Sequence, residues 1–310
     1  MNRIQKYQES MERFLRNKTH DIIDNNSINL ISSLLRNNNY LMAIFLLTIS
    51  NNTNKKNKIQ QHGYYIGCSM ELLFLLLKIT EKKIKINNTN ILILMSLINI
   101  MLVNNIELST GLFTKEKNIK NYNSSIKLLN TKIIEINNNY NFKNNNFLMS
   151  DLFNYKFKDL EKIKNKIKLS NKINKEEMIK YIEDKYCNII KFACGLTWNL
   201  GGGNENSAKY IQKLGYYYGI LLKFNVDLED IESDIMQENK INNSYPSLII
   251  NLGIQQSFEF FFDIKQKFIE LSIKLGLYNS IVKEIIDFIE NRFDIFLANT
   301  VLDIREEYEI

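Results

Sequence analysis

Residues 195–230 read GLTWNLGGGNENSAKYIQKLGYYYGILLKFNVDLED, and this stretch decides the fold prediction. A helix end rich in small residues leads into a glycine triplet at 201–203, and a helical pattern then continues over 206–232 into the sequence VDLED at 226–230. Asp227 and Asp230 lie three positions apart, so they share one face of that helix. A pair of this kind suits one weakly bound metal ion, but it is more often found on a solvated helix surface.

The composition indicates an all-α protein. The chain has 310 residues, of which 45% are hydrophobic, with 11 glycines and one proline. Proline removes a backbone donor and clashes with the preceding helical turn, so its scarcity is compatible with long helices. No linker separates two composition regimes, which favours a single domain of about ten or more helices. Helices are predicted over 4–16, 21–36, 40–50, 60–82, 90–103, 122–136, 147–168, 175–199, 206–232, 247–277 and 279–304.

Two features indicate where the core lies. Residues 60–82 are apolar on nearly every face, which is typical of a helix at the centre of a bundle. Cys187 and Cys194 are seven positions apart and are expected to share a buried helix face. Together with Cys68 they form an odd set without CxxC spacing, which argues against a disulfide framework or a zinc site and fits a reducing compartment.

Charge and hydropathy exclude some functions. The net charge of +6 comes from 40 basic and 34 acidic residues and is too mild and dispersed to indicate nucleic-acid binding. No apolar run reaches the roughly 18 residues of a membrane span. Residues 1–19 are expected to form an N-terminal amphipathic helix or extension before a helical domain over 20–310. Their acidic residues Glu9 and Glu12 are unusual in a transit peptide, so cytoplasm and organellar matrix, including the mitochondrion, both stay open.

Gly219 to Asp230 resembles the second aspartate-rich segment, G-L-x-F-Q-x-x-D-D-x-x-D, of the trans-isoprenyl (polyprenyl) diphosphate synthase family. Val226 stands in place of the first aspartate, and Lys223 in place of the glutamine. The only proline falls in 242–248, which resembles the family's K-x-T-x-P-S-L with an asparagine for the lysine. The resemblance implies an isoprenoid synthase-like helical bundle around a central cavity.

The same resemblance locates the residues that would handle diphosphate and magnesium. Glu71-Leu72 matches the family's E-L before the first motif, whose aspartates then fall on Glu81, Lys82 and Lys85. A lysine in place of an aspartate would repel Mg²⁺ instead of attracting it, so no metal cluster is expected there. Asp227 and Asp230 remain as weak metal ligands. The cations that could still bind diphosphate are Arg36, Lys185 and Lys223.

We consider three functions for this degenerate member of the family. The first is a non-catalytic or regulatory subunit of a heteromeric prenyl synthase, paired with an active homologue. The second is a structural subunit of a larger, organellar assembly. The third is a divergent, Mg²⁺-dependent trans-prenyltransferase that joins isopentenyl diphosphate to an allylic diphosphate. A homodimer is compatible with the third reading, and no cofactor is expected under the first two.

Overall fold

A computed structural model describes residues 3–37, 39–53, 61–82, 87–110, 175–201, 203–238 and 247–308. Within these ranges the regular structure is helical. The elements are α1 (Arg3–Thr19), α2 (Asn25–Asn37), α3 (Leu41–Thr53), α4 (Gln61–Lys82), α5 (Asn88–Thr110), α8 (Lys175–Ile182), the π-helical turn η3 (Glu183–Cys187), α9 (Asn188–Leu200), α10 (Glu205–Glu238), α11 (Leu248–Leu252), α12 (Ile254–Lys274) and α13 (Ser280–Tyr308).

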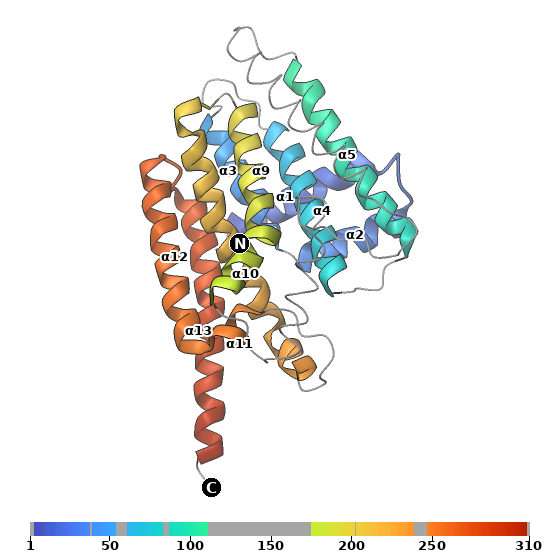
Figure 1. The fold of residues 1–310 in the computed structure, drawn as a ribbon. Helices are drawn as coiled ribbons and strands as arrows, with labels where there is room; N and C mark the ends of the chain where they lie inside the picture. Colours follow the sequence, from blue (N-terminus) through green and yellow to red (C-terminus); the bar gives the residue numbers. More distant parts are fainter. Residues whose placement is uncertain are drawn as a thin grey trace.

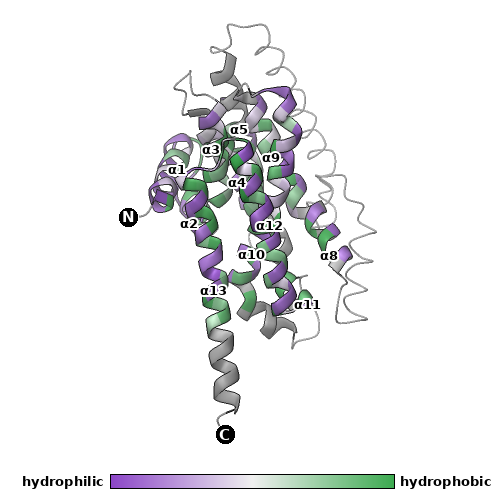
Figure 2. Ribbon diagram, turned by 90° about the vertical axis from the view of Figure 1, so that its left-hand side faces the viewer, coloured by the Kyte–Doolittle hydropathy of each residue, from purple (hydrophilic) through white to green (hydrophobic). Residues whose placement is uncertain are grey.

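The helices form one bundle whose middle is occupied by α3, α4, α9 and α10. In Figure 1, α12 and α13 flank α10 on one side, while α5 stands at the opposite edge beside α4, and the end of α13 extends beyond the bundle. Residues 41–50 of α3 are all buried, and α4 is buried along most of its described length. The central position predicted for 60–82 is therefore confirmed. Figure 2 shows hydrophilic residues on the outward faces of the surrounding helices.

Close packing joins η3 and α9 to α10. A Cβ placed on Gly219 would lie 2.8 Å from the Cα of Cys187, and a Cβ on Gly215 would lie 2.9 Å from the carbonyl oxygen of Ile190. Only glycine therefore allows the two backbones to approach at these points. Cys187 and Cys194 are both buried, as their spacing predicts.

The connection between α9 and α10 is packed against Trp198. The indole N–H of Trp198 donates a hydrogen bond of 2.9 Å to the carbonyl oxygen of Asn204. A Cβ on Gly203 would lie 2.2 Å from the Trp198 ring, so the ring covers the loop only because this residue has no side chain. Gly203 is thus needed for packing.

Several predicted helix bounds differ from the structure, and two of the differences have a local cause. The segment predicted as one helix over 247–277 is divided into α11 and α12 by Gly253, whose φ of 77° only glycine adopts readily. The helix predicted to start at residue 21 begins at Asn25, because the Asp24 carboxylate accepts the backbone N–H of Ser27 and caps the helix. The helices predicted over 122–136 and 147–168 lie outside the described residues.

Among the described helices, none combines the length and the apolar character of a membrane span. The N-terminal helix α1 packs onto the bundle through Ile4, Met11 and Leu15, which are buried. Aromatic rings fill the space between α10, α12 and α13, where Phe224 contacts Phe261 and Phe293.

Candidate functional site

The VDLED sequence at 226–230 lies on the second half of α10, and its Asp227 forms a buried ion pair. The Lys223 ammonium lies 2.5 Å from the Asp227 carboxylate, one helical turn earlier on the same face. The two side chains are only 5% and 2% exposed. Two unit charges of opposite sign at this distance and burial neutralise each other, and each would be costly to bury alone.

The second carboxylate oxygen of Asp227 connects α10 to the next helix. It accepts the backbone N–H of Leu248 at 2.8 Å, and Leu248 is the first residue of α11. This N–H has no partner within α11, because the first N–H groups of a helix cannot reach a preceding turn. Asp227 therefore satisfies a buried backbone donor as well as the charge of Lys223.

The π-helical turn η3 contributes the ring of Tyr186 to this site. The Lys223 ammonium lies 5.1 Å from the ring centre of Tyr186, within the range of a cation–π contact. Tyr186 belongs to η3, where the helix predicted over 175–199 takes an extra residue into one turn. That turn packs against α10, and Tyr186 is buried there. Side chains from η3 and α10 and a backbone group of α11 thus meet around one ion pair.

Glu71, the glutamate of the E-L pair that resembles the family, also accepts a hydrogen bond from a backbone N–H. Glu71 on α4 is buried, and its carboxylate accepts the backbone N–H of Ala43 at 3.0 Å in the first turn of α3. From α10, the Tyr218 hydroxyl donates to the carbonyl oxygen of Leu41 at 2.7 Å. Burial raises the pKa of Tyr218 well above its usual value, and the nearby Glu71 carboxylate raises it further. Two neighbouring helices thereby fix the start of α3.

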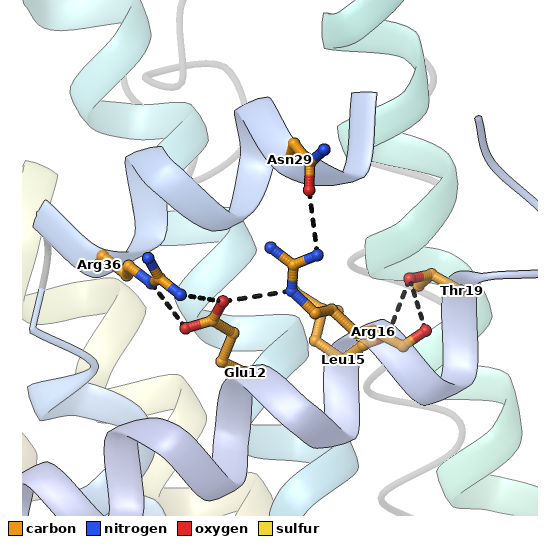
Figure 3. A network of polar contacts seen from close by, with 6 residues as sticks. All are labelled: Glu12, Leu15, Arg16, Thr19, Asn29 and Arg36. Carbon is orange, nitrogen blue, oxygen red and sulfur yellow. Dashed lines mark hydrogen bonds and ion pairs between the residues drawn. The ribbon is translucent and has the colours of Figure 1, made fainter. Parts of the chain in front are cut away.

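Arg36, a predicted diphosphate ligand, binds a carboxylate of the protein itself. Figure 3 shows its guanidinium reaching Glu12 with two hydrogen bonds of 2.7 Å, while Arg16 reaches the same carboxylate at 3.2 Å. Arg16 also donates to Asn29 at 3.0 Å. The hydrogen bond from Arg36 lowers the pKa of Glu12 below its usual value. This network ties α1 to α2 across the bundle surface.

The structure brings together two of the predicted site residues, Lys223 and Asp227. Asp230 and Lys185 belong to α10 and η3, and Glu81 and Lys82 to the last turn of α4, but the described side chains do not include theirs. Lys85 lies outside the described residues. Where side chains are described, no cluster of three or more histidine, cysteine, aspartate or glutamate side chains is placed to hold a metal ion.

The geometry can be compared with known proteins. No protein-family model matches the chain, and no curated protein matches it by sequence. An FPP/GFPP synthase from Zymomonas mobilis has a TM-score of 0.56 at 8% identity, covering 93% of this chain and 97% of its own. A geranylgeranyl pyrophosphate synthetase from the archaeon Geoglobus acetivorans has a TM-score of 0.52 at 13% identity, covering 94% and 98%.

The chain has the fold of the trans-prenyl diphosphate synthases. A third structure with this prenyl synthase fold, a geranyltransferase from Helicobacter pylori, contains magnesium and isoprenyl diphosphate. It has a TM-score of 0.53 at 13% identity, covering 94% of this chain and 97% of its own. The all-α fold expected from the sequence is confirmed, and these identities establish the fold alone.

Magnesium does not fit the Asp227 carboxylate of this chain. A Mg²⁺ site needs carboxylate oxygens open to the ion and to its water ligands. Here one oxygen faces the Lys223 ammonium, the other accepts the N–H of Leu248, and the side chain is 2% exposed. A divalent cation at this carboxylate would also stand beside a fixed positive charge.

Sequence reasoning missed three groups that complete these contacts. The spacing of four between Lys223 and Asp227 was visible and is a normal signal for an ion pair on a helix. The ring of Tyr186 and the N–H of Leu248 carried no signal, because they reach the pair from other elements. The same holds for Glu12, the partner of Arg36.

Proposed function

We propose that this protein is a catalytically inactive member of the prenyl diphosphate synthase family that acts as a non-catalytic subunit of a heteromeric synthase. The observation that carries the proposal is the closed Lys223–Asp227 pair. An aspartate that the family resemblance assigns to metal binding is used here to hold Lys223 and the start of α11.

The remaining replacements support the same conclusion. The resemblance puts lysines at two of the three first-motif positions, Lys82 and Lys85. It also expects a phosphate grip near Arg36, whose guanidinium is engaged by Glu12. By contrast, glycines that allow close packing, such as Gly219, are retained. Retention of packing positions with loss of metal-binding positions is the pattern of a fold kept for association.

The partner we propose is a homologue with intact D-D-x-x-D motifs. Such a homologue would supply the chemistry, and this chain would contribute stability or control of product length. The test is affinity purification from the native cell, followed by an assay of isopentenyl and allylic diphosphates with Mg²⁺. We expect the recovered pair to be active and this chain alone to be inactive. Polyprenyl diphosphate synthesis by this chain alone would refute the proposal and favour a divergent trans-prenyltransferase.

A structural subunit of a larger assembly is the second candidate. It is favoured by the aromatic packing between α10, α12 and α13, where Phe261 and Phe293 stack with ring centres 5.3 Å apart. A core filled in this way needs no substrate to be stable. Recovery of many proteins in fixed stoichiometry, without a synthase homologue, would favour this role.

A further inference from the structure

We propose that Lys223 is a built-in cation that replaces a metal ion at the second motif: its ammonium joins η3, α10 and α11 through Asp227. The inference rests on the proposed non-catalytic function. It adds a specific role for one residue, which is to supply from the chain itself the positive charge that this buried carboxylate requires.

The first argument is electrostatic. Asp227 is buried within α10, and a carboxylate there without a counter-charge carries a large desolvation cost. The Lys223 ammonium at 2.5 Å supplies that charge. Because the lysine lies on the same helix, four residues earlier, the counter-charge is present as soon as α10 forms. A dissolved ion would instead have to be bound.

The second argument is geometric. The ammonium is held between the Asp227 carboxylate and the Tyr186 ring, at 2.5 Å and 5.1 Å. The opposite carboxylate oxygen binds the first N–H of α11. A monovalent cation fixed by a side chain therefore does what a metal ion often does in a fold, because it holds together groups from separate segments.

The experiment is chemical rescue of stability in Lys223→Ala, measured by thermal unfolding. Removal of one partner of a buried ion pair should lower Tm by about 6–10 °C, the range expected for an uncompensated buried charge. Propylammonium reproduces the deleted atoms and should restore part of the loss. Propanol has a similar shape without the charge and should restore much less.

The control is the double variant Lys223→Ala/Asp227→Ala, which lacks the Asp227 carboxylate that would bind the added cation. We expect it to be more stable than the single variant and indifferent to propylammonium. If the single variant does not fold but the double variant does, the uncompensated carboxylate is the cause, which supports the proposal. Equal rescue by propanol and propylammonium would overturn it, and so would a single variant as stable as the wild type.

A second measurement uses Mn²⁺ as a probe of the unmodified protein. Electron paramagnetic resonance should detect no Mn²⁺ binding that depends on Asp227, so the wild type and Asp227→Asn should give the same titration. Binding that is lost in Asp227→Asn would overturn the inference, even if neither alanine variant folds. Neither thermal unfolding nor Mn²⁺ binding depends on enzymatic activity. A catalytically active wild type would therefore refute the proposed function, while the stability measurements would still decide the role of Lys223.

Discussion

Substitution of Gly219 by alanine tests whether the turn η3 and helix α10 are held together by backbone contact. The new Cβ would lie 2.8 Å from the Cα of Cys187 and 3.0 Å from its sulfur. Because the nearest atom belongs to backbone, it cannot rotate away, and the helices must separate. Overpacking of this kind costs about 3 kcal/mol at the upper end of its usual range.

The same substitution has a favourable component that must be subtracted. Alanine in a helix interior is about 1 kcal/mol better than glycine, since it loses less backbone entropy. The net effect expected for Gly219→Ala is therefore a destabilisation of about 2 kcal/mol. In a domain of this size that corresponds to a Tm lower by about 4 °C.

Gly195→Ala is the matched control. Gly195 lies inside α9, the helix that follows the turn η3, but its new Cβ would meet only the flexible side chain of Gln212, at 3.4 Å. This variant should gain up to about 1 kcal/mol from helix propensity. Urea unfolding of both variants should separate them by about 3 kcal/mol. Equal stability of the two variants would refute the packing argument.

Three further predictions concern polar and reactive groups. Tyr218→Phe removes the hydrogen bond to the Leu41 carbonyl oxygen and should destabilise the protein by about 1–2 kcal/mol in urea unfolding; an unchanged midpoint would show that the bond is immaterial. The pKa of Glu12 in the folded protein is lowered from its usual 4.5, chiefly by Arg36, so the stability that the pair contributes is present above pH 4.5 and disappears as the pH falls through the lower folded value. Arg36→Ala should therefore be less stable than the wild type at pH 7 and approach it in acid, whereas a gap that widens in acid would contradict this sign. Burial raises the pKa of the Cys68 thiol, and all three cysteines are buried, so a thiol reagent should label them only after unfolding, and rapid labelling of the native protein would contradict their placement.

Several features of this protein follow from the sequence by local physics. The scarcity of proline and glycine permits long helices, and the apolar faces of 60–82 demand burial, so an all-α bundle with this segment inside was predictable. The spacing of Cys187 and Cys194 placed both on one buried face for the same reason. The spacing of apolar residues along a helix involves only near neighbours in the chain, so it can be recognised from the sequence alone.

The tertiary structure decided the remaining features. One glycine conformation at Gly253 divides a segment whose composition reads as one helix, and an extra residue in the turn at 183–187 brings Tyr186 towards Lys223. The sequence alone left Asp227 between metal ligand and solvated surface residue. In the structure this side chain is buried against Lys223, and a backbone N–H 21 residues later in the chain, at Leu248, donates to its second oxygen. Contacts between segments so far apart depend on how the helices pack, and no local pattern encodes them.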